Sequence, residues 1–110
     1  MPDDLKSQLK RILERHEGRS MAITSRELST ALQIDERRIR LAIRELITEG
    51  LPVASSTESP AGYFLVGNWG EAYQYARSVR NRLIEDAVRR RDFMRSAALY
   101  LKPAEQVKLL

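Results

Sequence analysis

Apolar positions recur at helical spacing along the first part of the chain. Over residues 4–17 they follow the i, i+4, i+7, i+8 pattern of one buried helix face. After a short apolar stub at residues 21–23, Thr24 and Glu27 have the spacing of a capping box, in which each side chain accepts a hydrogen bond from the other residue's backbone N–H. The pattern therefore predicts two helices, at residues 4–17 and 25–32.

A third helix is predicted from residue 36 to about residue 49. Asp35 is a favourable N-cap, and Gly50 suits the left-handed residue that follows many helices. On a helical wheel the apolar positions of this segment fall on one side, which is expected to face the core. They are Ile39, Ala42, Ile43 and Leu46.

Beyond Gly50 the pattern changes to two short strand-like runs, residues 51–55 and 62–66, separated by turn-forming residues. These runs predict a β-hairpin. Asn68 then has the position of an N-cap, with a glutamate three residues later, and a long helical pattern continues to about residue 101. Aromatic residues concentrate in this part of the chain and are expected to seal the hairpin onto the helical core: Tyr63, Phe64, Trp69, Tyr73 and Tyr75.

The predicted order is helix, strand stub, helix, tight turn, helix, hairpin, helix. Over residues 4–67 the chain resembles the winged helix-turn-helix family, in which two short helices joined by a tight turn precede a hairpin called the wing. The likeness is carried by residues 23–28 at the start of the second helix, residues 31–35 at the turn, and the apolar positions of the third helix with Gly50 and Leu51. The hairpin followed by an arginine-bearing helix is similar to small winged-helix proteins of phages and prophages.

The expected fold is therefore mostly α with a small β-hairpin. The resemblance implies a winged-helix domain at residues 1–67. A long C-terminal helix for packing or dimerisation is expected at residues 68–102, and a tail at residues 103–110.

The charge of the chain is unevenly placed. Lys and Arg number 19 against 15 Asp and Glu, which gives a net charge of +4. Residues 1–66 sum to zero, so residues 67–110 carry the whole excess. Most of the basic residues are arginines, whose planar guanidinium suits bidentate contacts with phosphate or carboxylate. A basic excess indicates an anionic partner.

The third helix carries the candidate DNA-reading residues. Arg37, Leu41 and Arg44 lie opposite its apolar side, flanked by Arg38 and Arg40. The resemblance implies that this helix enters the major groove, where Arg pairs with guanine and an apolar side chain meets a thymine methyl group. The alternative is a solvated face on which the arginines pair with neighbouring acids.

The start of the second helix is a candidate phosphate contact. Ser25 and Arg26 lie where free backbone N–H groups favour an anion. The alternative is that these groups only cap the helix.

The hairpin departs from the family pattern. Wings that contact DNA carry basic residues at their tip, but no basic residue occurs between Arg44 and Arg77, and Glu58 lies in the predicted loop. This acidic tip favours an alternative in which the winged helix is a protein-interaction or structural module that does not bind DNA.

The long helix has an apolar stripe that extends beyond the reach of a core of this size. Such a stripe is expected to pack against a second copy of the chain, because two-fold pairing is the commonest solution for soluble oligomers. The predicted dimer residues are Val79, Leu83, Ala87, Met94, Ala98 and Leu101. The alternative is a solvated helix.

Enzyme chemistry is not expected. The chain has no Cys and one His, His16, and its glycines match no nucleotide-binding motif. We therefore expect no catalytic residue, metal, cofactor or small-molecule ligand. No apolar run approaches the length of a membrane span, and the N-terminal residues resemble neither a signal nor a transit peptide, so a cytoplasmic location is expected.

Taken together, the pattern and the resemblance predict a sequence-specific protein for double-stranded DNA. Such a protein would act as a small phage or prophage type of transcriptional regulator, as a homodimer that reads the major groove with residues 35–49.

Overall fold

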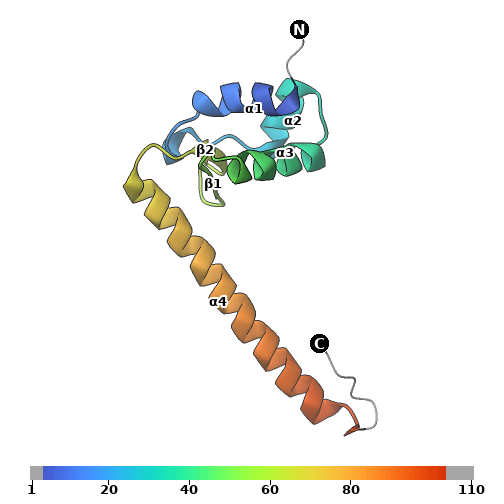
Figure 1. Ribbon diagram of the computed structural model, residues 1–110. Coiled ribbons are helices and arrows are strands. Elements are labelled where there is room, and N and C mark those ends of the chain that lie inside the picture. Colours follow the sequence, from blue (N-terminus) through green and yellow to red (C-terminus); the bar gives the residue numbers. More distant parts are fainter. Residues whose placement is uncertain (1–3, 104–110) are drawn as a thin grey trace. The chain divides into compact units, whose positions relative to one another are not determined.

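The computed structural model describes residues 4–103 (Figure 1). Its elements in chain order are α1 (Leu5–Glu14), the 3₁₀ turn η1 (Arg19–Met21), α2 (Ser25–Leu32), α3 (Glu36–Thr48), β1 (Val53–Ser56), β2 (Gly62–Leu65) and α4 (Trp69–Tyr100). The predicted mostly helical fold with a small antiparallel hairpin and a long C-terminal helix is confirmed at this level.

Helices α2 and α3 begin at the residues that the sequence predicts, and α1 begins at Leu5, one residue after its predicted start. The side chains of Asp4, Thr24 and Asp35 each accept a hydrogen bond from the backbone N–H three residues later, at 2.8, 3.0 and 2.8 Å. The capping box is complete, because Glu27 also accepts from the Thr24 N–H at 3.1 Å. These bonds satisfy backbone donors that an uncapped helix leaves unpaired.

The first helix ends at Glu14, three residues before its predicted end. The backbone after it is used by β2 instead: the Leu65 N–H donates to the His16 carbonyl at 2.9 Å, and the Gly18 N–H donates to the Leu65 carbonyl at 2.8 Å. Gly18 adopts φ +89°, a left-handed conformation that favours glycine. Pairing with a distant strand therefore ends the helix.

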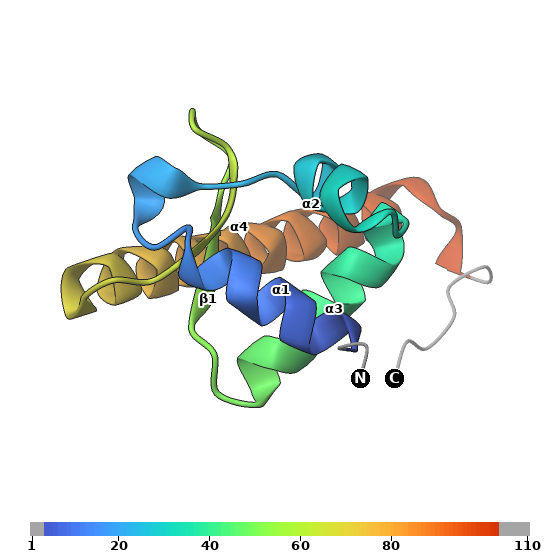
Figure 2. The same cartoon turned by 90° about the horizontal axis from the view of Figure 1, so that it is seen from above.

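The core lies where α1 and α2 pack on α3 (Figures 1 and 2). All four predicted apolar positions of α3 are buried. They form one cluster with Leu9 and Leu13 of α1, Leu28 of α2 and Val53 of β1. This cluster fixes which side of α3 remains exposed.

The hairpin pairs in antiparallel register, with Ser55 opposite Tyr63 and Ala54 opposite Phe64. The apolar stub before α2 adds to it, since Ile23 and Tyr63 exchange two backbone hydrogen bonds at 2.7 and 2.8 Å. Gly62 adopts φ +128°, and a Cβ at this position would collide with the Ile23 carbonyl.

Part of the expected aromatic seal is wrong. Phe64 is buried, but the Trp69 side chain is 75% exposed and Tyr73 is also exposed; the two rings contact each other with centroids 5.6 Å apart. The physical reason is helical geometry: Glu71 and Tyr75 occupy the side of the first two turns of α4 that faces the hairpin and η1, which leaves Trp69 and Tyr73 on the opposite side.

The chain divides into two units, Met1–Tyr75 and Ala76–Leu110, with the boundary inside α4. No residue of α4 is buried. None of the helices in the described part of the chain is both long and apolar enough to cross a membrane. The predicted tail lies outside the described residues except for Pro103.

Candidate nucleic-acid interface

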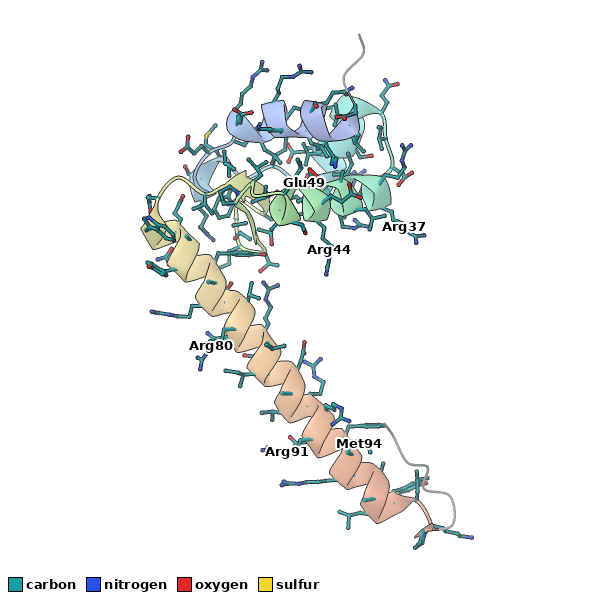
Figure 3. The ribbon with its side chains drawn as sticks, in the orientation of Figure 1. Arg37, Arg44, Glu49, Arg80, Arg91 and Met94 are labelled. Atoms are coloured by element: carbon teal, nitrogen blue, oxygen red, sulfur yellow. The ribbon has the colours of Figure 1, made fainter. Side chains whose placement is uncertain are left out.

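One exposed side of α3 brings together four of the predicted DNA-contacting residues. Arg37, Leu41 and Arg44 follow one another at steps of four and three residues, Arg40 lies next to Leu41, and all four are exposed. Figure 3 shows Arg37 and Arg44 extending from the side of α3 that faces away from α1. The apolar side of the same helix is held in the core, so the orientation of this arginine face is fixed by packing.

A groove of about 410 Å³ runs along this face and continues onto the hairpin. Besides the four predicted residues it is lined by Ile43, Ile47, Ser55, Tyr63 and Tyr75. Leu41 is 53% exposed, and Ile47, which lines the same groove, is exposed as well. The groove therefore offers cations, hydroxyl groups and apolar surface within one concave site.

Residues outside α3 were not predicted as part of this site. Tyr63 follows from strand alternation, because Phe64 next to it is buried and successive side chains point to opposite faces. Burial raises the pKa of the Tyr63 phenol, and the nearby Arg40 opposes that shift. Tyr63 thus presents a protonated hydroxyl to the groove at neutral pH.

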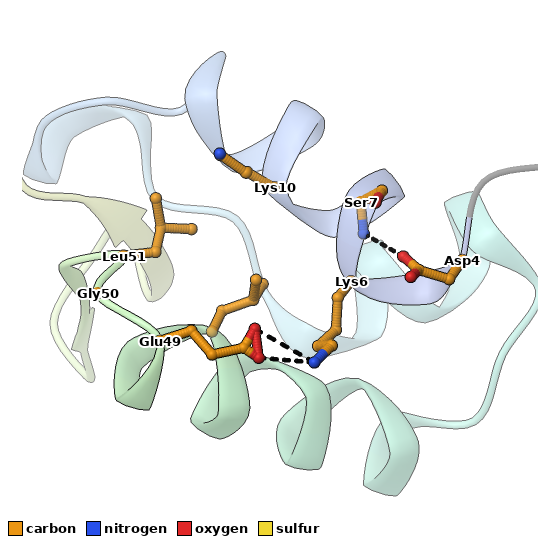
Figure 4. A pocket seen from close by; sticks show the side chains of 8 residues that line it. Asp4, Lys6, Ser7, Lys10, Glu49, Gly50 and Leu51 are labelled. Carbon is orange, nitrogen blue, oxygen red and sulfur yellow. Dashed lines mark hydrogen bonds and ion pairs between the residues drawn. The ribbon is translucent and has the colours of Figure 1, made fainter.

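The acidic residues at the end of α3 lie on the flank of the helix that faces α1. Lys6 of α1 bonds to Glu49 at 2.6 Å and lies 3.4 Å from Glu45 (Figures 3 and 4). The hydrogen bond to Glu49 raises the pKa of Lys6. Both carboxylates are therefore held by α1 rather than by the arginines of the exposed face.

The first residue of α3, Glu36, is the acid nearest the arginine face. It accepts a hydrogen bond from the Ser25 hydroxyl at 2.8 Å and lies 3.7 Å from the Arg40 guanidinium. Arg37 and Arg44 make no ion pair within residues 4–103. Two of the three arginines thus keep their full charge available.

The remaining predicted contacts do not line this groove. The Ser25 hydroxyl donates to Glu36, which places a negative charge at the start of α2, where Arg26 is exposed. Arg38 borders a neighbouring hollow of about 300 Å³ with Leu5 and Lys6 of α1, and Leu41 lines both this hollow and the groove. The structure therefore groups Arg37, Arg40, Leu41 and Arg44 but does not bring Arg38 or Ser25 to the same groove.

The acidic wing has a basic partner that the sequence did not reveal. Arg19 of η1 donates to Ser56 and to Glu58, each at 3.1 Å. Arg19 and Glu58 are 39 positions apart, and no local pattern links them. The negative charge of the predicted tip is therefore offset by a guanidinium, which weakens the expected repulsion of phosphate.

No group of three or more His, Cys, Asp or Glu side chains in the described residues could hold a metal ion. In comparisons with known proteins, the chain matches no family model, no curated protein and no solved structure.

Proposed function

We propose that this protein binds double-stranded DNA and that residues 4–67 form a winged helix-turn-helix. The order of elements supports this proposal, as does the pairing of Ile23 with Tyr63, an isolated antiparallel bridge beside β2. Gln33 in the left-handed conformation makes the tight turn between α2 and α3. The two helices of the motif are α2 and α3, and in this arrangement the second of them, α3, lies in the major groove.

The arginine face of α3 is the observation that carries the proposal. Three guanidinium groups share one exposed side, and the acids at the C-terminal end of the helix are bound by Lys6 on the flank toward α1. Within α3 only Arg40 pairs with an acid at i, i+4, Glu36, whereas Arg37 and Arg44 make no ion pair in the described residues. The unpaired arginines give this side a positive potential, which attracts the DNA backbone.

Three residues of the face have a DNA-contacting role in the proposal. Arg37 and Arg44 donate paired hydrogen bonds to guanine or bind phosphate, and Leu41 packs on a thymine methyl group. The Arg19 guanidinium neutralises Glu58 at the wing, so the wing tip does not repel the DNA backbone. A protein of this kind regulates transcription by occupying its site.

A protein partner is the second candidate, favoured by exposed Leu41 and Ile47 together with Tyr63 in the same groove. Aromatic and Arg side chains are also enriched at protein interfaces. The two candidates differ in salt dependence, because release of counterions from DNA gives a slope of about −0.9 in log K against log salt for each phosphate neutralised.

The test is a fluorescence polarisation titration with random-sequence duplex DNA at several salt concentrations. We expect the double variant Arg37→Ala/Arg44→Ala to weaken binding at least about tenfold and to flatten the salt slope. The matched control Lys10→Ala/Arg15→Ala removes the same charge from exposed positions of α1 and is expected to bind nearly as the parent chain does. Equal losses in both variants would contradict the proposal.

A further inference from the structure

The part of α4 beyond residue 75 carries an exposed seam that repeats every seven residues. Its positions alternate in steps of three and four, as in the contact line of a coiled coil. Along a helix that buries none of its residues, Leu83 is 69% exposed, Phe93 67% and Tyr100 90%. The seam consists of positions 76, 79, 83, 86, 90, 93, 97 and 100.

When two copies of the seam run in opposite directions, the residues that face each other are complementary. Pairing positions at equal distances from residue 88 matches Ala76 with Tyr100, and Val79 with Ala97. A small residue thus meets a larger one in both layers. Such alternation fills a helix interface without voids or overlap, which is the condition for dense packing.

The central layers pair two large apolar residues in one case and two opposite charges in the other. Leu83 is matched with Phe93, and Asp86 with Arg90. Asp86 and Arg90 are the only charged residues of the seam, and reversal sets each opposite the other. From these matches we infer that α4 pairs with α4 of a second copy of the chain in an antiparallel coiled coil centred on residue 88.

Parallel pairing lacks this complementarity. It sets every seam position opposite its own copy, so Asp86 faces Asp86 and Arg90 faces Arg90. Like charges in the contact line are destabilising, and polar residues there are a known determinant of coiled-coil partner choice. The large Tyr100 would also meet itself, and the small Ala76 would leave a gap.

The stripe predicted from the sequence is compatible with this pairing. Val79 and Leu83 lie in the seam, and Ala87, Met94 and Leu101 lie along one flank of it. The apolar flank widens the contact beyond the seam itself. Ala98 lies one position further out.

In this pairing residue 75 lies opposite residue 101 of the second copy. The two copies of residue 75 are therefore 26 residues, about 39 Å, apart along the helix axis.

Disulfide trapping tests the pairing without DNA, so its result is independent of DNA binding. The chain has no cysteine, so Leu83→Cys and Phe93→Cys each introduce a single thiol. In the antiparallel register the two thiols face each other in a mixed dimer. Two copies of position 83 lie about 15 Å apart along the axis, beyond the Cα separation of roughly 7 Å that a disulfide tolerates.

We expect a mixture of the two variants to give a cross-linked heterodimer under oxidation, and neither variant to cross-link alone. Self-cross-linking of either variant would show parallel pairing and overturn the inference. A monomeric mass for the unmodified full chain in sedimentation at micromolar concentration would also overturn it.

Charge reversal provides a second readout. Asp86→Arg is expected to weaken the dimer at least about tenfold, and the double variant Asp86→Arg/Arg90→Asp to restore it. Asp92→Arg is the matched control, because Asp92 also pairs with a neighbouring arginine but lies outside the seam. Circular dichroism checks that each variant keeps its helix. Equal weakening by Asp86→Arg and Asp92→Arg, or no rescue in the double variant, would overturn the register.

Discussion

The carboxylate of Glu71 accepts a hydrogen bond from the backbone N–H of Arg19 at 2.9 Å, across 52 positions of sequence. Its other oxygen accepts from the Gly67 N–H at 2.8 Å. The Arg19 side chain in turn binds Glu58 in the wing. Arg19 of η1 therefore connects the first turn of α4, through its backbone, with the hairpin loop, through its side chain.

Glu71→Gln is expected to lower the free energy of unfolding at neutral pH by roughly 1 kcal/mol, because an amide presents only one acceptor oxygen to two backbone donors. The same substitution at Glu85, which is exposed on α4 and makes no ion pair in the described chain, is the control. Urea unfolding followed by circular dichroism measures the difference. Equal stability of the two variants would contradict the bridging role.

The contribution of Glu71 depends on pH with a definite sign. The two backbone hydrogen bonds hold the pKa of this carboxyl below its ordinary value of 4.5. A group whose pKa is lowered by folding stabilises the fold above its unfolded pKa, and that stability disappears as the pH falls through the folded pKa. We therefore expect the gap between the parent chain and Glu71→Gln to be constant above pH 4.5 and to close as the pH falls further. A stability difference that grows as the pH falls would contradict a lowered pKa for Glu71.

Glu58→Lys is expected to tighten binding to random duplex DNA and to steepen the salt slope by at least about 0.9, because it adds a cation at the wing and releases Arg19. Glu14→Lys makes the same charge change on an exposed position of α1 and serves as the comparison. Polarisation titrations at several salt concentrations separate the two variants. Identical slopes would mean that the wing tip lies away from the phosphates.

Gly62→Ala is expected to destabilise the chain more than Gly50→Ala. Both glycines have positive φ, +128° and +111°, so both substitutions introduce backbone strain of about 1–2 kcal/mol. At Gly62 the added Cβ would also collide with the Ile23 carbonyl, whereas nothing lies within 4 Å of it at Gly50. Thermal unfolding of the two variants measures the difference. A larger loss at Gly50 would contradict the close approach of the stub to the hairpin.

Leu41→Ala is expected to reduce the preference for a selected DNA sequence over random DNA without changing the salt slope, since an apolar contact releases no counterion. The side chain is exposed and outside the core, so the stability of the fold should change by less than about 0.5 kcal/mol. Competition titrations with specific and random duplexes measure the preference. A changed slope with an unchanged preference would remove Leu41 from the base-reading set.

Local features of the fold were predictable because they depend on residues within one turn. Thr24 and Asp35 cap helices through bonds that span three positions, and the buried face of α3 follows from its period. The end of α1 was not predictable, because it depends on Leu65, a residue of a distant strand. Trp69 was misplaced because aromatic composition does not tell which side of a helix faces the core.

The candidate site divides in the same way. Arg37, Leu41 and Arg44 follow from the helical wheel, since the core fixes one side of α3. The hydrogen bonds from Ser25 to Glu36 and from Arg19 to Glu58 were not predictable, because each depends on a tertiary contact between elements. Strand alternation could have predicted which face of the hairpin carries Tyr63. Its placement beside Arg40 could not be predicted, because it depends on how the hairpin packs on α3.

Mapping of a duplex DNA titration onto backbone amide signals by NMR tests the role of α3 most directly. We predict the largest shift changes at residues 37–48 and at the hairpin loop, with little change around Lys6 and Lys10 on α1. Changes concentrated on α1, or none at all at DNA concentrations that saturate non-specific binders, would contradict the assignment of the arginine face to DNA.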